Sequence, residues 1–179
     1  MAKKTKKGLI IVHTGNGKGK TTAAMGMALR GAGYHFKTLM IQFIKGSWSY
    51  GELDAVRHLH PHFQIKPMGK GFIRTQGKGL RPQDVKAIQE AWEFSKKNIF
   101  SGELDMIILD EITYVIDGDL IPLDRVLDVL NSKPPDLHLV LTGRDAPQQL
   151  IERADLVTEM KEVKHPFRKG IKAQKGVEF

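Results

Sequence analysis

Short apolar runs alternate with longer helix-forming segments along this chain of 179 residues. The clearest runs lie at residues 9–13 and 106–109, and each is bounded by charged residues or glycine, a pattern typical of strands buried on both faces. The first strand and the next one along the chain start about 30 residues apart, which fits one β-α-β unit. Further strands are expected at residues 38–43, 63–66 and 137–142 and from residue 156 onward.

The segments between these strands carry helix signals. Residues 21–32 are rich in Ala and Met and precede Gly33, a common helix stop. Pro82 suits the first turn of a helix that runs to about residue 100. Shorter helices are expected at residues 122–130 and 147–154. Without an internal repeat or linker, this alternation predicts one α/β domain over residues 1–179, with a mostly parallel sheet and helices on both faces.

The segment between the first strand and the first helix carries the strongest chemical signal. It reads Thr-Gly-Asn-Gly-Lys-Gly-Lys-Thr-Thr over residues 14–22, and it offers the close approach, the backbone N–H groups, the lysine and the hydroxyl that a triphosphate with Mg²⁺ requires. The strict pattern G-x-x-x-x-G-K-[ST] has glycine where this chain has Thr14, and a glycine-rich surface turn is the alternative. The flanking strand and helix favour a phosphate-binding loop (P-loop, residues 14–21). Its predicted binding residues are Gly15, Asn16, Gly17, Lys18, Gly19, Lys20, Thr21 and Thr22.

Within this loop, Lys20 is expected on phosphate, Thr21 on Mg²⁺ and the N–H groups of residues 16–20 around the phosphates. Asp110 and Glu111 directly follow the apolar run at residues 106–109. Ligands of α/β sheets bind at the carboxyl ends of the strands, where an acidic pair holds Mg²⁺ or contacts nucleotide. Capping of the next segment is the alternative for either acid alone. The pair and the P-loop together predict a metal site formed by Thr21, Asp110 and Glu111, in which Mn²⁺ is able to replace Mg²⁺.

The net charge of +8 comes from the two ends of the chain. Residues 1–7 carry four lysines and no acid, residues 161–179 carry six bases against two acids, and the body between them is neutral. This distribution argues against nucleic acid as a partner, although a basic arm that binds nucleic acid, with ATP as regulator, is an alternative. The absence of cysteine excludes disulfides and thiolate metal sites. No apolar run approaches the ~18 residues of a membrane span, so we expect a cytoplasmic protein without a membrane partner.

The P-loop does not decide which bond of ATP is broken. Attack at phosphorus makes a kinase or an ATPase, whereas attack at the ribose carbon uses the whole triphosphate as the leaving group. The chemistry of the residues alone leaves both open.

Five segments, the P-loop among them, resemble the ATP:corrinoid adenosyltransferases of the P-loop type in order and spacing, from about residue 8 to the C-terminus. They are residues 14–24, Gln42-Phe43-Ile44-Lys45-Gly46, residues 109–114, Thr142-Gly143-Arg144 and residues 163–179. The resemblance implies a RecA-like homodimer that transfers the 5′-deoxyadenosyl group of ATP to Co(I) of a reduced corrinoid (cobalamin or cobinamide) and releases tripolyphosphate. A P-loop ATPase or small-molecule kinase of RecA-like fold is the alternative.

The resemblance also implies roles for residues near the P-loop. Co(I) is itself a strong nucleophile, so no general base is needed, and Lys18 and Lys20 are the catalytic residues because they stabilise charge on the departing triphosphate. Arg30 is implied as a nucleotide contact, with a solvated arginine near a helix end as the alternative.

Residues 68–79 are implied as the loop over the corrinoid, with a basic surface loop as the alternative. Phe72 matches the family's aromatic pattern, but Arg74 stands where that pattern has tryptophan. The resemblance further implies an electron donor, such as a flavoprotein, that reduces Co(II) to Co(I).

Overall fold

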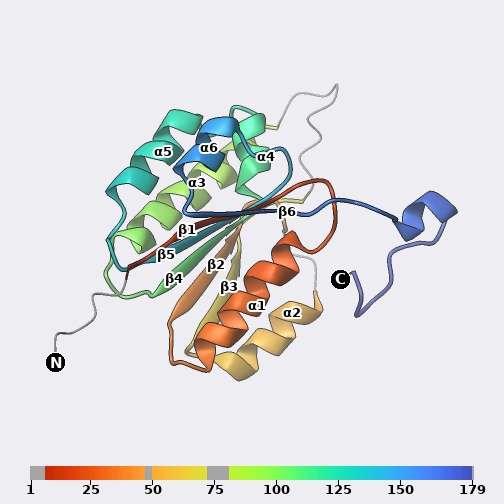
Figure 1. Cartoon of the computed structure of the whole chain (residues 1–179), viewed down its shortest axis with the longest axis horizontal. Coiled ribbons are helices and arrows are strands. Elements are labelled where there is room, and N and C mark those ends of the chain that lie inside the picture. The colour runs from red at the N-terminus through yellow and green to blue at the C-terminus, as the bar shows by residue number, and fades with distance from the viewer. Residues whose placement is uncertain (1–6, 47–49, 72–80, 179) are drawn as a thin grey trace.

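The computed structural model describes residues 7–46, 50–71 and 81–178, and these form an α/β fold around one sheet (Figure 1). The strand order is β3-β2-β4-β5-β1-β6, and every pair of neighbouring strands is parallel. The carboxyl ends of all strands therefore lie at one edge of the sheet, which we call the carboxyl edge. The strands are β1 (Ile10–Thr14), β2 (Thr38–Gln42), β3 (Phe63–Pro67), β4 (Met106–Asp110), β5 (His138–Thr142) and β6 (Leu156–Glu159).

Helices cover both faces of the sheet, as the sequence predicts (Figure 1). One face carries α1 (Lys20–Ala32) and α2 (Gly51–Ala55), followed by the 3-10 turn η1 (Val56–Leu59). The other face carries α3 (Pro82–Ile99), α5 (Leu123–Ser132) and α6 (Gln148–Arg153), while α4 (Ile112–Asp117) follows β4 and η2 (Pro166–Lys169) lies in the C-terminal segment. Among the described residues, no helix is both long enough and apolar enough to cross a membrane.

Alternation along each strand divides the core into two layers. On the α1 face, Ile11 and Ile108 pack with Ala24 and Ala28, whose small side chains let the helix approach the sheet closely. On the opposite face, the other set of strand side chains packs against α3, α5 and α6. Because both layers are covered by helices, the inner strands are apolar at almost every position, which is why they were recognisable in the sequence. The central strand residues of this second layer are Val12, Ile41, Ile107, Leu109, Leu139 and Leu141.

Two helices were not expected from the sequence, and both have a physical reason. The helix α2 is five residues long and contains no buried residue, so it carries no apolar periodicity. The helix α4 contains the run Ile-Thr-Tyr-Val-Ile, which has β-branched residues typical of a strand. Burial of Ile112, Val115 and Ile116 in the core outweighs that local preference.

The core assignment can be tested on Ile107, whose side chain is fully buried in β4. Ile107→Ala should lower the free energy of unfolding by about 2–5 kcal/mol, since it removes apolar contacts and leaves a cavity. The matched variant Leu29→Ala, at a side chain 59% exposed on α1, should change it by no more than about 0.5 kcal/mol. Urea unfolding followed by circular dichroism measures both values. Equal losses would contradict the placement of Ile107 in the core.

Candidate active site

The P-loop joins the carboxyl end of β1 to the start of α1, as predicted. Gly15 and Gly19 adopt φ values of 94° and 109°, a left-handed conformation that other residues rarely take. The Lys20 ammonium turns back over the loop and donates hydrogen bonds to the carbonyl oxygens of Gly15 and Gly17, at 2.7 and 2.6 Å. Burial, together with the nearby charge of Arg144, lowers the pKa of Lys20. A cation and the N-terminus of α1 thus meet at the carboxyl edge, which is an arrangement suited to an anion.

The carboxylate of Asp110 connects the P-loop to the sheet. It is fully buried, and its Oδ1 accepts hydrogen bonds from the hydroxyls of Thr21 at 2.8 Å and Thr142 at 2.7 Å. Its Oδ2 accepts a hydrogen bond from the side-chain amide of Gln42 at 3.2 Å. Burial raises the pKa of Asp110, while these donors act in the opposite direction. The structure therefore brings together Thr21 and Asp110, which the sequence placed in one site.

Gln42 and Thr142 have functional positions that motif chemistry did not identify, although both lie in segments that carried the family resemblance. They are the last residues of β2 and β5, and alternation puts them on the α1 face beside Asp110. A polar residue that ends an otherwise apolar buried strand was the signal for both.

Glu111 lies at the start of α4 with a φ of 63°, and its backbone N–H donates to the Thr142 hydroxyl at 2.9 Å. Burial, and then the charge of Asp110, raise the pKa of Glu111 to about 7. The Thr21 hydroxyl and the two neighbouring carboxyl groups are hard oxygen donors of the kind that Mg²⁺ and Mn²⁺ prefer. The donor set of Thr21, Asp110 and Glu111 therefore fits the predicted metal.

Lys45, in the loop that follows β2, is a further cation of this site. Its ammonium lies 2.8 Å from a carboxylate oxygen of Glu52 and 4.6 Å from the centre of the Tyr50 ring. Burial acts to lower the pKa of Lys45, but Glu52, Asp110 and Glu111 raise it above its ordinary value. Lys45 thus stays charged beside the acidic pair.

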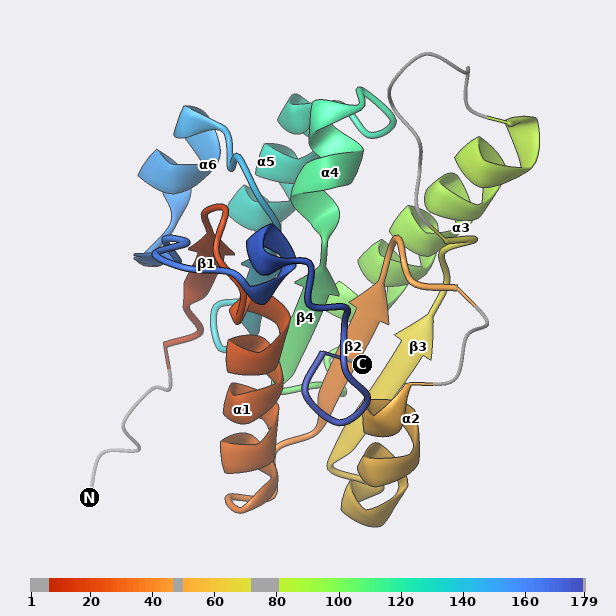
Figure 2. The ribbon, with the colours of Figure 1, turned by 90° about the vertical axis from the view of Figure 1, so that its right-hand side faces the viewer.

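The segment that follows β6 packs directly on the P-loop (Figure 2). The Met160 N–H donates to the Thr14 carbonyl at 2.8 Å, and the Met160 carbonyl accepts from the Gly17 N–H at 2.7 Å. Close to this contact, the Asn16 side-chain oxygen accepts from the Glu162 N–H at 3.0 Å. A Cβ on Gly15 would lie 2.5 Å from the Met160 oxygen, so only glycine fits there.

These contacts refine the expected phosphate cradle. The N–H of Gly17 donates to the Met160 carbonyl, so it is not free for a phosphate, which differs from the predicted cradle. The side chain of Asn16 is occupied in the same way by Glu162. The N–H groups at the start of α1 remain directed to the carboxyl edge.

The C-terminal segment also reaches Lys18. The Lys18 ammonium lies 2.7 Å from a carboxylate oxygen of Glu178, and the Lys18 side chain is 50% exposed. The basic C-terminal segment therefore brings an acid to one of the two lysines predicted to bind triphosphate.

The remaining predicted residues divide into three groups. Thr22 lies at the first turn of α1, and its hydroxyl donates to the Gly19 carbonyl at 3.0 Å. Arg30 is exposed near the opposite end of α1, and with a rise of about 1.5 Å per residue its Cα lies about 15 Å from that of Lys20. Within one chain Arg30 therefore lies away from the P-loop, and its contact with nucleotide stays a prediction. Phe72 and Arg74 lie outside the described residues.

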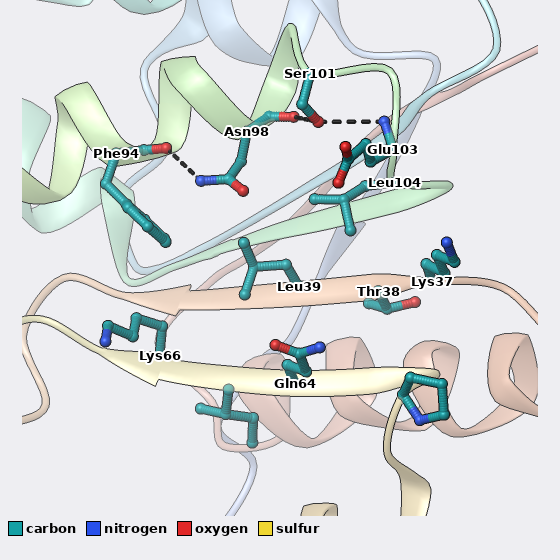
Figure 3. Close-up of a pocket in the computed structure, with 12 residues that line it drawn as sticks. Lys37, Thr38, Leu39, Gln64, Lys66, Phe94, Asn98, Ser101, Glu103 and Leu104 are labelled. Carbon is teal, nitrogen blue, oxygen red and sulfur yellow. Dashed lines mark hydrogen bonds between the residues drawn. The ribbon is translucent and has the colours of Figure 1, made fainter.

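A pocket of about 440 Å³ lies away from this site, between α3 and the strands β2 and β3 (Figure 3). Figure 3 shows Asn98 and Phe94 of α3 facing Leu39 and Gln64 across it. None of its lining residues belongs to the P-loop or the acidic pair. The chemistry predicted from the sequence is therefore not located in this pocket.

The ion pair between Lys18 and Glu178 predicts competition between the C-terminal segment and a bound triphosphate. Glu178→Gln should tighten binding of ATP with Mg²⁺ by about two- to five-fold, because a pair that is partly exposed on its lysine side contributes about 1 kcal/mol. Isothermal titration calorimetry measures the change. The matched variant Glu93→Gln, which removes an exposed carboxylate paired with Lys96 on α3, should bind as wild type. Unchanged or weaker binding by Glu178→Gln would contradict this competition.

The raised pKa of Glu111 predicts a pH dependence of stability in the metal-free protein. Between about pH 4.5 and about pH 7, the folded chain keeps a proton on Glu111 that the unfolded chain, with an ordinary glutamate pKa, has released. The free energy of unfolding should therefore fall as pH rises through this window, by up to about 1.4 kcal/mol per pH unit. Urea unfolding should show Glu111→Gln gaining stability relative to wild type across the window and levelling off above it. Parallel curves for the two proteins would contradict the shift.

Comparison with known proteins agrees with the geometry of this site. A model of the family described as ATP:corrinoid adenosyltransferase BtuR/CobO/CobP matches residues 6–179. The corrinoid adenosyltransferase of Escherichia coli (strain K12) is 42% identical over 173 residues, which cover 97% of this chain and 86% of that protein. The corrinoid adenosyltransferase of Sinorhizobium sp is 46% identical over 183 residues, which cover 100% of this chain and 84% of that protein.

A solved structure shows the same fold at low sequence identity. The flagellar accessory protein FlaH from Methanocaldococcus jannaschii has a TM-score of 0.53 and 12% identity, and the match covers 86% of this chain and 71% of that one. It supports the RecA-like fold alone, whereas the family model and the two enzymes cover nearly the whole sequence. The chain therefore belongs to the ATP:corrinoid adenosyltransferase family.

Proposed function

We propose that this protein transfers the 5′-deoxyadenosyl group of ATP to Co(I) of a reduced corrinoid, in the biosynthesis or salvage of adenosylcobalamin. The observation that carries the proposal is the P-loop joined through Thr21 to Asp110, in a chain that matches corrinoid adenosyltransferases over nearly all of its length. In this reaction cobalt attacks C5′ with its electron pair. The bond between C5′ and oxygen breaks, and tripolyphosphate leaves with the electrons of that bond.

The residues of the P-loop have a defined task in such a reaction. Cobalt supplies the nucleophile, so the protein has to hold C5′ against it and to stabilise the negative charge of the leaving group. Lys20, Lys18 and the N–H groups at the start of α1 lie at the carboxyl edge, which supports their assignment to the second task. Thr21, Asp110 and Glu111 would hold Mg²⁺ or Mn²⁺, which supplies further positive charge to the triphosphate.

The corrinoid site is proposed beside the end of β2. The Gly71 N–H donates to the Ile44 carbonyl at 2.9 Å, so the chain enters the segment of Phe72 and Arg74 from the carboxyl edge. Because Gly71 lies beside the end of β2, the position of Gly71 supports our proposal that the segment after it contacts a corrinoid bound above the P-loop. A homodimer, an electron donor such as a flavoprotein and a cytoplasmic location stay predictions of the family resemblance.

The alternative of a P-loop ATPase or small-molecule kinase differs from this proposal in the bond that is broken. Both use the same lysines and the same metal site, but hydrolysis or phosphoryl transfer yields ADP. An adenosyltransferase yields tripolyphosphate, so analysis of the products separates the two.

Incubation with ATP, Mg²⁺ and chemically reduced cobalamin should give the light-sensitive spectrum of the adenosylated corrinoid and one tripolyphosphate per corrinoid. Lys20→Ala should lower kcat/KM by about 100-fold or more, because it removes a preorganised positive charge of the protein that stabilises the leaving group. The matched variant Lys86→Ala, exposed on α3, should retain wild-type activity. Formation of ADP and orthophosphate as the only products would overturn the proposal.

A further inference from the structure

The loop that follows β5 is hydrogen-bonded to the last two residues of β1, next to the P-loop. The Gly143 N–H donates to the His13 carbonyl at 3.2 Å, and the Ala146 N–H donates to the Thr14 hydroxyl at 3.1 Å. The residue that departs from the strict P-loop pattern, Thr14, thus has a structural use. Its hydroxyl holds residues 143–146 against the start of the P-loop.

The same loop also forms a hydrogen bond with α4. The fully buried hydroxyl of Thr113 donates to the Arg144 carbonyl at 2.6 Å. Gly143 has a φ of 144°, and a Cβ there would lie 1.9 Å from the Thr113 hydroxyl oxygen, so another residue would displace this contact. The backbone of Arg144 is therefore held from two directions, while its side chain is exposed.

The charge of Arg144 lies close enough to Lys20 of the P-loop and to Glu111 of the acidic pair to act on both. Its guanidinium acts on Lys20, on Glu111 and on Tyr114, and in each case it lowers the pKa of that group. These three groups come from α1, from the end of β4 and from α4. An exposed cation that acts on all of them lies above the carboxyl edge of the sheet.

Arg144 differs from the other cations of this edge in its partners. Lys18 pairs with Glu178 and Lys45 pairs with Glu52, while Lys20 donates to two loop carbonyls. In residues 7–46, 50–71 and 81–178, by contrast, no carboxylate lies within 4.0 Å of the Arg144 guanidinium. Its five N–H donors, arranged as a planar fork, match two oxygens of a phosphate.

We propose that Arg144 binds the triphosphate of ATP and stabilises it as it leaves, and that Thr113 is the positioning residue that orients Arg144. The proposal rests on the proposed function, since it assigns a further residue to the leaving group of that reaction. It adds a cation from the loop after β5 to the lysines of the P-loop.

Direct binding of inorganic tripolyphosphate with Mg²⁺, measured by isothermal titration calorimetry, tests the contact without corrinoid or turnover. Arg144→Ala should weaken binding by about 10- to 100-fold, the range produced by losing hydrogen bonds to a charged group. Arg144→Lys should fall between wild type and Arg144→Ala, because it keeps the charge and loses the fork. The matched variant Arg125→Ala, exposed on α5, should bind as wild type.

The positioning role of Thr113 is tested by a double-mutant cycle. Thr113→Val should weaken tripolyphosphate binding by about five- to ten-fold, and Thr113→Ser, which keeps the hydroxyl, should restore it. In the Arg144→Ala background, Thr113→Val should cause no further loss, since its effect passes through Arg144. Melting temperatures of all variants show whether each protein is folded.

Wild-type affinity for tripolyphosphate in Arg144→Ala would overturn the proposal, as would an equal loss in Arg125→Ala. Additive losses of Thr113→Val and Arg144→Ala would overturn the positioning role. Failure of the proposed function looks different: the wild-type protein would bind tripolyphosphate, Arg144→Ala would bind it weakly, and reduced cobalamin would not be adenosylated. A wild-type protein that does not bind tripolyphosphate would refute the contact itself.

Discussion

The hydrogen bond from the Thr21 hydroxyl to the buried carboxylate of Asp110 is the contact on which the site depends. It joins the first turn of α1 to the centre of the sheet, and it fixes two of the three groups that are proposed to hold the metal. A buried carboxylate is tolerated only when donors satisfy it, and Thr142 and Gln42 supply the others. Three strands and one helix therefore converge on one side chain, so the site is as rigid as the core beneath it.

Positively charged side chains surround the acidic pair that contains this carboxylate. The acidic pair lies in the middle of the carboxyl edge, and Lys20, Lys45 and Arg144 act on it from three different loops. A neutral chain body thus contains a strongly polarised edge. The net charge of +8 belongs to the two ends of the chain and says little about this arrangement.

The sequence predicted the strands, the longer helices between them and the P-loop, but not the short helices α2 and α4. Burial on both faces makes continuous apolar runs, and the loop has a fixed pattern of glycine and lysine. The sequence also placed Thr21 with Asp110 and Glu111, since parallel strands end at one edge. It did not identify Gln42 and Thr142 from chemistry, because single polar residues at strand ends have no spacing pattern. The ion pair between Glu178 and Lys18 depends on how the C-terminal segment returns to the P-loop, and no local sequence pattern predicts that path.

The hydrogen bond from the Gly17 N–H to the Met160 carbonyl joins the P-loop to the segment that directly follows β6. During synthesis the P-loop leaves the ribosome well before β6 and the segment that follows it. Domains fold as units, and here the Gly17 N–H gains its partner, the Met160 carbonyl, only when translation has passed residue 160. The contacts of the P-loop are consequently completed only after residue 160 has emerged, so a shorter nascent chain does not present a finished P-loop to ATP.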